Sequence, residues 1–177
     1  VKTIRPNIKT TQVGEVIQQT ITQYGFKPIW NLSGHQMRRY VVHTGKSIPN
    51  VARFTVSKIQ EDEVYAVEPF LTFSHGSGEV RGTREAYIFR LQRAKRTRNT
   101  KVRHLQEFIQ QQFRSMPFSQ RWFTELELDD WLPAFNELVR NRSITGYPPL
   151  VERKNQIVAQ AEHTVIVTED GCLVTTM

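Results

Sequence analysis

NLSGHQMRRYVVHTGKSIPN, residues 31–50, carries two histidines, His35 and His43, between apolar segments of the chain. Gly34 allows the backbone to come close to whatever His35 faces, because glycine has no side chain. A neutral imidazole is the commonest transition-metal ligand among side chains. A histidine beside a glycine is also a common turn residue, so a metal role for His35 requires further ligands elsewhere in the sequence.

Two carboxylates occur in settings that favour such a role. Glu68 lies in VYAVEPF and Glu162 in VAQAEHTVIV, and each interrupts a run typical of a buried strand. A lone carboxylate in an apolar run is costly unless it is paired or bound to a metal. Together with His35 these residues predict part of a divalent-metal site. The alternative is that both carboxylates occupy surface-facing edge positions.

Composition is that of a globular protein. The chain has 177 residues, with 38% hydrophobic content, three Trp and ten Phe, enough for one domain with an insert. We expect a cytoplasmic protein without a membrane segment, because no apolar run is long enough to span a bilayer and the N-terminal residues lack a signal-peptide core. Cys172 is the only cysteine, which excludes an internal disulfide.

The net charge of +7 is concentrated in one segment. Residues 81–103 contain nine Lys or Arg and one acid, so the rest of the chain is close to neutral. Such a run is most often a solvated face, but it can also contact RNA or the ribosome. The candidate nucleic-acid contacts are Arg93, Lys95, Arg96 and Arg98.

The hydrophobic periodicity predicts an α+β protein with an antiparallel sheet. An amphipathic helix is expected to begin at Thr10 or Thr11 as its cap and to end near Gly25. Strands are expected at 40–42, 51–56, 64–67, 71–73, 86–91, 150–153, 157–161, 162–168 and 172–176. Between them, residues 92–146 are expected to form a compact three-helix unit, with one helix at 101–114, one around Trp122 and Phe123, and one capped by Asp129 or Asp130.

Five motifs then occur in an order typical of one family. They are NLSGHQMRRYVVHTGKSIPN, VYAVEPF, YPPLVE, VAQAEHTVIV and the terminal VTTM. In these motifs the chain resembles the C-terminal part of a type II methionine aminopeptidase of the archaeal kind. The resemblance covers the chain from about Arg5 to its end and includes a helical insert. Proline dipeptidases have a similar fold but lack the SIPN and YPPL patterns and this insert.

The resemblance implies the second half of the pita-bread fold. Residues 1–91 and 147–177 would form the C-terminal half of the catalytic domain, and 92–146 the inserted helical subdomain. The implied activity is removal of the initiator methionine from nascent proteins by two-metal hydrolysis. The two divalent ions would be Co, Mn, Fe or Zn.

The resemblance also implies roles for individual residues. His35, Glu68 and Glu162 would be metal ligands, Glu68 would also move a proton, and His43 would contact the scissile amide. The walls of the methionine pocket would include Val42, Phe70 and Tyr147. Gln36, Thr44 and Ala161 depart from the residues usual in the family, which affects the expected pocket shape more than the metal chemistry.

The family takes two aspartate ligands and a further histidine from its first half, which the resemblance does not cover. We therefore expect a C-terminal subunit or fragment of a split aminopeptidase, active only with a second polypeptide that supplies those ligands. A processed or truncated enzyme from a single gene would have the same sequence. The alternative is a non-catalytic module of the same fold that binds RNA or the ribosome through residues 81–103.

Overall fold

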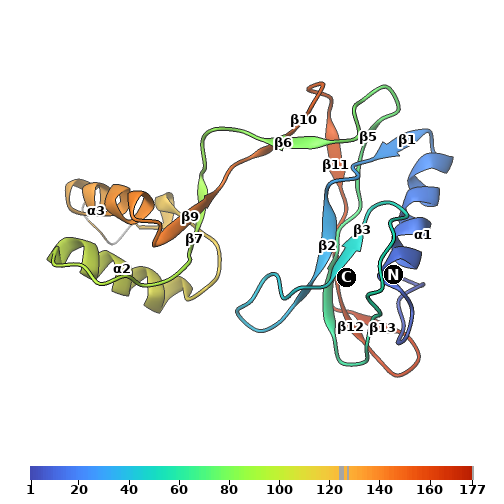
Figure 1. Ribbon diagram of the computed structural model, residues 1–177, viewed down its shortest axis with the longest axis horizontal. Helices are drawn as coiled ribbons and strands as arrows, with labels where there is room; N and C mark the ends of the chain where they lie inside the picture. The colour runs from blue at the N-terminus through green and yellow to red at the C-terminus, as the bar shows by residue number, and fades with distance from the viewer. Residues whose placement is uncertain (124–125, 127, 177) are drawn as a thin grey trace. The chain divides into compact units, whose positions relative to one another are not determined.

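The computed structural model describes residues 1–123, 126 and 128–176, without the side chains of residues 128–130. The described chain divides into two compact units, the first formed by residues 1–81 and 150–177 and the second by residues 82–149 (Figure 1). The second unit thus begins before and ends after the expected insert 92–146. The last residue of the terminal VTTM motif, Met177, lies outside the described residues.

The first unit combines one helix with short strands. Its elements are α1 (Thr10–Gln23), β1 (Phe26–Pro28), β2 (Ser33–Met37), β3 (Ser47–Pro49), β4 (Val64–Val67), β5 (Phe70–Phe73), β6 (Val80–Gly82), β10 (Leu150–Glu152), β11 (Val158–Gln160), β12 (His163–Val167) and β13 (Cys172–Val174). Among the described residues these strands form a five-stranded sheet of order β13-β12-β4-β2-β3, a three-stranded sheet of order β1-β5-β11, and the pair β10-β6.

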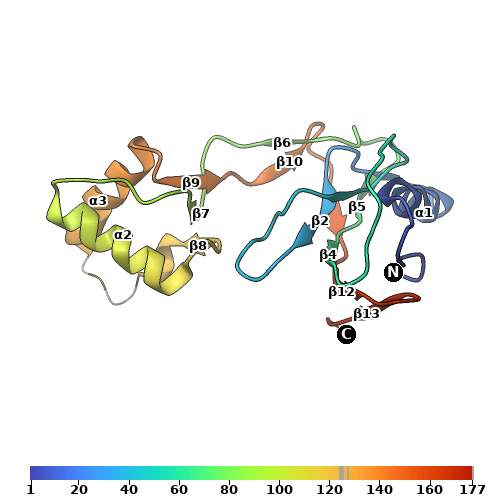
Figure 2. The ribbon, with the colours of Figure 1, turned by 60° about the horizontal axis from the view of Figure 1, so that its bottom comes forward.

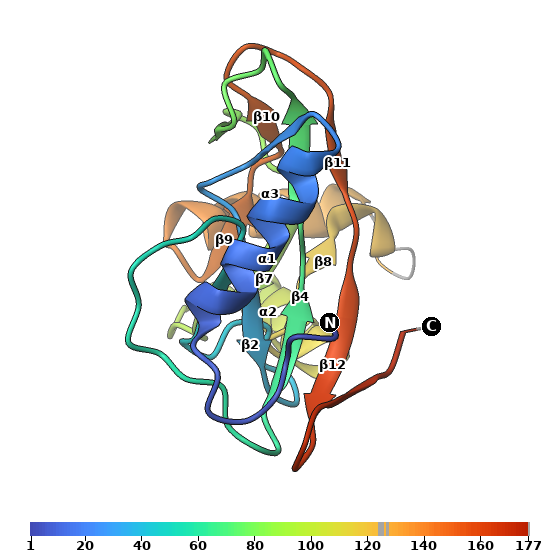
Figure 3. The ribbon, with the colours of Figure 1, turned by 90° about the vertical axis from the view of Figure 1, so that its right-hand side faces the viewer.

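The core of the first unit lies between α1 and the five-stranded sheet. Val13 of α1 packs with Ile48, Tyr65 and Val165 from three different strands. Figure 3 shows α1 running along this part of the unit. The C-terminal strand β13 returns to the N-terminal residues, since Cys172 Sγ lies 3.6 Å from the carbonyl oxygen of Val1 (Figure 2).

The second unit has its own core. Its elements are β7 (Ile88–Leu91), α2 (Thr100–Phe113), β8 (Phe118–Ser119), the 3₁₀ turn η1 (Gln120–Trp122), α3 (Leu128–Arg140) and β9 (Ile144–Tyr147). Helices α2 and α3 pack on the sheet β8-β7-β9 around an aromatic cluster. At its centre, the ring of Phe135 meets that of Phe89 edge-on at 4.9 Å between centroids.

The α+β architecture and the antiparallel strand pairing are confirmed. Two expected strands are wrong: residues 40–42 form a turn, and residues 51–56 have no strand structure. The histidine stretch itself supplies β2 and β3. Apolar character alone misled the prediction at 51–56, because Phe54 is 95% exposed and forms no ladder.

Two further details differ from expectation. Helix α1 begins at Thr10, so Lys9 is its cap, and the Gln12 side chain accepts the Lys9 amide at 3.0 Å. Around Trp122 there is a single 3₁₀ turn where a helix was expected, although residues 124, 125 and 127 of that segment lie outside the described residues. The expected caps Asp129 and Asp130 fall inside α3, as its second and third residues.

Candidate metal centre and its surroundings

His35 and Glu68 form a close pair in the five-stranded sheet. Nε2 of His35 lies 3.0 Å from Oε1 of Glu68, and the two side chains are only 12% and 15% exposed. The hydrogen bond to Glu68 raises the pKa of His35 above its ordinary value of 6.5, although burial acts in the opposite direction. The structure therefore brings together two of the three predicted ligands.

Strand register explains this proximity. His35 on β2 pairs with Ala66 on β4, and Glu68 lies two residues further along, on the same face as Ala66. On the other side of β4, His163 pairs with Val67, and the amide of Ala161 donates to the carbonyl of Pro69 at 3.2 Å. The backbone of Glu162, the residue before β12, is therefore opposite that of Glu68, the residue after β4.

The side chain of Glu162 is exposed and is not part of the His35–Glu68 pair. Its Oε2 accepts a hydrogen bond from Nε2 of Gln160 at 3.3 Å. Within the described part of the chain, no group of three or more His, Cys, Asp or Glu side chains is arranged to hold a metal ion. The three-ligand set therefore stays a prediction, supported by the backbone register of Glu162 and by the contact between the other two residues.

The donors that are present suit a divalent ion. Imidazole nitrogen and carboxylate oxygen are the usual ligands of Zn, Mn, Fe and Co. Nδ1 of His35 is also buried without a hydrogen-bond partner among the described atoms. Buried polar atoms without a hydrogen-bond partner are uncommon in folded proteins. This nitrogen therefore keeps a hydrogen-bonding capacity that no described group of the protein uses. The residues of this site therefore fit a metal ion.

His43 lies beside His35. It belongs to the loop between β2 and β3, and its ring centroid is 4.0 Å from that of His35, with the ring planes tilted by 42°. The loop is closed at its base, because the amide of Gln36 donates to the carbonyl of Lys46 at 2.9 Å and the amide of Thr44 to that of Gln36 at 3.0 Å. Val42, next to His43, is partly buried.

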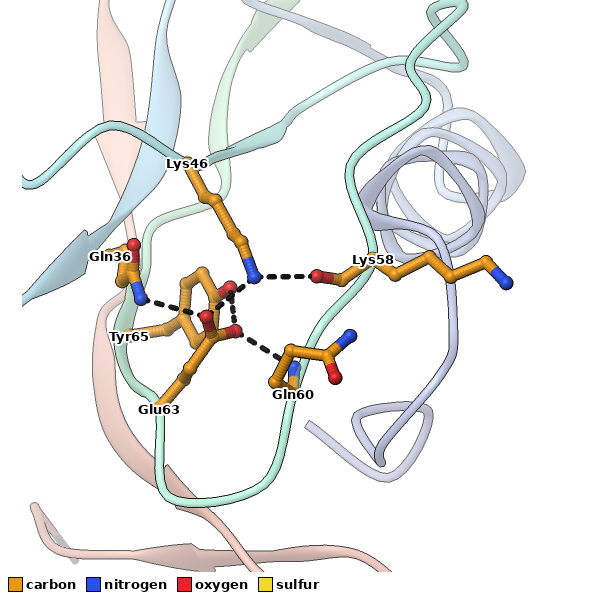
Figure 4. A network of polar contacts seen from close by, with 6 residues as sticks. All are labelled: Gln36, Lys46, Lys58, Gln60, Glu63 and Tyr65. Atoms are coloured by element: carbon orange, nitrogen blue, oxygen red, sulfur yellow. Dashed lines mark hydrogen bonds and ion pairs between the residues drawn. The ribbon is translucent and has the colours of Figure 1, made fainter.

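A carboxylate that sequence analysis did not single out holds this loop in place. Glu63 accepts hydrogen bonds from the side chains of Gln36, Lys46 and Tyr65 and from the amide of Gln60, at 2.5–3.0 Å (Figure 4). Burial raises the pKa of Glu63, but these donors outweigh burial and place its pKa below the ordinary 4.5. The sequence feature that could have pointed to Glu63 was Gln36, because a polar residue on a buried strand needs a hydrogen-bond partner.

The predicted pocket walls are divided between the units. Phe70 begins β5 in the first unit, is partly buried and pairs with Gln160 of β11. Tyr147 is the last residue of β9 in the second unit, where it pairs with Ile88 and the guanidinium of Arg90 lies 5.9 Å from its ring centroid. A shared pocket for these residues stays a prediction.

An apolar groove of about 430 Å³ opens on the first unit. It lies between α1 and the strands that lead to the candidate metal centre. Its lining includes Val16, Ile17, Ile21, Val67, Leu71 and Ala161. Glu162 and His163 also belong to its lining, so one of the three predicted metal ligands borders this groove.

A second candidate site lies within the second unit. A cleft of about 800 Å³ is lined by the end of the basic segment and by one side of α2. Of the predicted nucleic-acid contacts it includes Lys95, Arg96 and Arg98, whereas Arg93 is not part of its lining. Arg103 of α2 adds a further cation.

Comparison with known proteins identifies the family of this chain. Residues 1–169 match metallopeptidase family M24. Methionine aminopeptidases from Methanocaldococcus jannaschii and Methanothermobacter thermautotrophicus are 41% and 38% identical to the chain over 99% of its length. The chain spans 58% of the length of each of these relatives.

Solved structures show the same fold. A structure described as a thermophilic Arx1 covers 97% of the chain at a TM-score of 0.75 and 18% identity, with the match spanning 46% of that protein. A methionine aminopeptidase from Rickettsia prowazekii covers the whole chain at a TM-score of 0.56 and 20% identity, again over 46% of its own length.

The fold is thus the pita-bread fold of the methionine aminopeptidases, as the motifs implied. The chain belongs to metallopeptidase family M24, and its similarity to the archaeal methionine aminopeptidases confirms the resemblance read from the five motifs. None of the described helices is long and apolar enough to span a membrane.

Proposed function

We propose that this chain is the C-terminal half of a type II methionine aminopeptidase that removes the initiator methionine from nascent proteins in the cytoplasm. The observation that carries the proposal is the pairing of His35 with Glu68 at 3.0 Å, with the tilted ring of His43 4.0 Å from that of His35 between centroids. The identity of 41% to an archaeal methionine aminopeptidase supports the same activity.

Each residue has a chemical role in this proposal. His35, Glu68 and Glu162 would hold two divalent ions, which supply Lewis-acid activation of water and of the peptide carbonyl. Glu68 would accept the proton of the attacking water and return it to the leaving amine. His43 would donate a hydrogen bond to the scissile amide. The remaining contacts to the methionine side chain would come from Val42, Phe70 and Tyr147.

The proposal includes a second polypeptide. Three protein ligands leave two ions incompletely coordinated, so two aspartates and a histidine would come from the partner, which corresponds to the part of the relatives that this chain does not span. The apolar groove of about 430 Å³ beside α1 supports such an association, because a partner that covers it would remove apolar surface from water.

Metal binding tests the site without relying on activity. Titration calorimetry of the chain with Mn²⁺ or Co²⁺ should show affinity that falls at least about tenfold in His35→Ala and in Glu68→Gln, since each change removes one donor. His75→Ala is the matched control, because His75 is an exposed histidine that contacts Gln156. Equal binding by wild type, His35→Ala and His75→Ala would rule out a metal role for His35.

Activity tests the need for a partner. The tagged chain is purified from its source cells under mild conditions, and the isolated complex is assayed for release of methionine from a Met-Ala peptide with Co²⁺ or Mn²⁺. The complex should be active and the chain alone inactive. Activity of the chain alone would disprove the requirement for a second polypeptide, and an inert complex would disprove the proposed activity.

The second candidate function is a non-catalytic module that binds RNA or the ribosome through residues 81–103. It is favoured by the basic cleft of the second unit, since contacts of Lys and Arg with phosphate give affinity without catalysis. Steeply salt-dependent binding of RNA by the chain would support it. A ribosome-facing surface would also suit an enzyme that acts on nascent chains, so RNA binding alone does not distinguish the two candidate functions.

A further inference from the structure

Lys95, Arg96, Arg98 and Arg103 line the cleft of the second unit together with one carboxylate, Glu107. At about 800 Å³ the cleft is within the range of ligand sites, roughly 300–1,000 Å³. All of its lining residues belong to the segment 94–110, so its geometry is set inside one compact unit.

The cations of the cleft are not used by the fold. Arg96, Arg98 and Arg103 are exposed, and their guanidinium groups have no ion pair or hydrogen bond to the residues that the structure describes. Lys95 differs, because its Nζ donates to the carbonyl oxygen of Asn141. In the first unit, by contrast, Lys46 is paired with the carboxylate of Glu63. Three arginines therefore line one cleft without an ion pair to any described carboxylate, although Glu107 also belongs to the lining.

The wall that carries these arginines is held by specific hydrogen bonds. Gln106 is buried on α2, and its side chain accepts the Lys95 amide at 2.9 Å and donates to the Lys95 carbonyl at 3.3 Å. Asn99 caps α2 by accepting the amides of Lys101 and Val102 at 3.1 and 3.4 Å. The segment between Lys95 and Asn99 is thus tied to the helix at both ends, and Arg96, Arg98 and Arg103 all belong to the lining of the cleft.

We infer that this cleft binds the phosphodiester backbone of a nucleic acid, with Arg96, Arg98 and Arg103 as the phosphate contacts. The inference rests on the second candidate function and assigns it a site. A guanidinium presents a planar fork of N–H donors that matches the oxygens of a phosphate. Clustered arginines repel one another, and a bound polyanion reduces this repulsion. Release of counterions from the nucleic acid then adds to the affinity. The inferred site differs from the sequence-based one in that Arg103 replaces Arg93.

The test compares two variants with the same change in charge. The cleft variant carries Arg96→Ala, Arg98→Ala and Arg103→Ala. The control carries Arg84→Ala, Arg121→Ala and Arg140→Ala, which are exposed arginines of the same unit outside the cleft lining. Fluorescence anisotropy measures binding of a labelled 20-base-pair RNA duplex, and of a DNA duplex of the same sequence, between about 50 and 200 mM salt. Circular dichroism checks that both variants are folded.

The cleft variant should bind at least about tenfold more weakly than wild type at low salt. The slope of log affinity against log salt should also fall in magnitude by about 2–3, because each lost phosphate contact removes about 0.9 for a duplex. The control should stay within about threefold of wild type, since only long-range, screened attraction is lost. Similar binding of both duplexes supports a site for the phosphodiester backbone of either nucleic acid. Tighter binding of the RNA duplex supports the same site with RNA as its ligand.

The failures are distinguishable. If wild type binds neither duplex at low salt, both the second candidate function and the cleft are wrong. If wild type binds but the two variants weaken equally, the candidate function stands and the assignment to the cleft is wrong. If polyglutamate displaces the duplex as well as unlabelled RNA does at equal charge concentration, the cleft is a general anion-exchange surface and the inference is overturned.

Discussion

Nζ of Lys46 lies 2.5 Å from Oε1 of Glu63 and 2.8 Å from the carbonyl oxygen of Lys58. Lys46 stands at the end of the loop that carries His43, so this contact ties the loop to the segment that leads into β4. Gln36 and Tyr65 donate to the same carboxylate from the neighbouring strands β2 and β4. Glu63 thus links strands β2 and β4 to the loop that carries His43 (Figure 4).

Replacing Glu63 with alanine should lower the free energy of unfolding by about 1–3 kcal/mol, because partly buried donors on Gln36, Lys46 and Tyr65 would lose their acceptor. Urea denaturation of the chain measures the change. Glu61→Ala is the matched control: Glu61 is an exposed glutamate two residues away, and its removal should cost no more than about 0.5 kcal/mol. Equal losses in the two variants would show that the network does not stabilise the fold.

The same carboxylate should make stability depend on acid pH. Its pKa is below 4.5 in the folded chain, so the unfolded chain binds the proton more readily. The contribution of Glu63 is therefore complete above its ordinary pKa and is lost as the pH falls through its lowered folded pKa. The difference in unfolding free energy between wild type and Glu63→Gln should be constant between about pH 5.5 and 7 and shrink below about 4.5.

Urea titrations at several pH values measure this difference. Glu152 also has a lowered pKa: burial raises it, but the amides of Gln156, Ser77, Lys154 and Gly78 outweigh burial. Because Glu152 titrates in both proteins, its contribution cancels in the comparison. A difference that does not change with pH would mean that the carboxylate of Glu63 has the same pKa in the folded and unfolded chains.

Gly34→Ala should destabilise the sheet beside His35. A Cβ at this position would lie 2.3 Å from the carbonyl oxygen of Ala66 on β4, so the two strands would have to move apart. Overpacking of this kind costs about 1–3 kcal/mol, which urea denaturation resolves. Gly171→Ala is the control, since the nearest atom to its added Cβ would be Thr168 Oγ1 at 4.0 Å. A variant at Gly34 as stable as this control would contradict the close strand approach.

Phe135→Ala should lower the free energy of unfolding of the second unit. Phe135 is 1% exposed and packs edge-on against Phe89, so its removal leaves a cavity that costs about 3–5 kcal/mol. The near-ultraviolet circular dichroism of the aromatic cluster reports the transition. Leu132→Ala on the same helix removes a side chain that is 39% exposed and should cost much less. Equal losses of unfolding free energy in Phe135→Ala and Leu132→Ala would show that Phe135 is not part of the core of this unit.

Local sequence patterns determined the elements that depend on neighbours in the chain. The apolar period of α1 and α2 and the β-branched and aromatic residues at 64–67 predict these elements, and they appear where they were expected. The prediction was wrong at 51–56, where apolar residues such as Phe54 and Val56 are exposed. Hydrophobicity indicates that a residue can be buried, but only packing decides whether a partner surface exists.

The sequence by itself determined the family and the concentration of charge in residues 81–103, and it predicts His35, Glu68 and Glu162 as metal ligands. Tertiary structure alone decided that His35 contacts Glu68, that Glu63 collects donors from four segments, and that Arg103 joins Arg96 and Arg98 in one cleft. Arg96, Arg98 and Arg103 are close in sequence, but for the contacts of His35 with Glu68 and of Gln36 with Glu63 the physical reason is distance along the chain. These contacts join residues brought together by strand register and helix packing, and no local pattern encodes which distant side chains will meet.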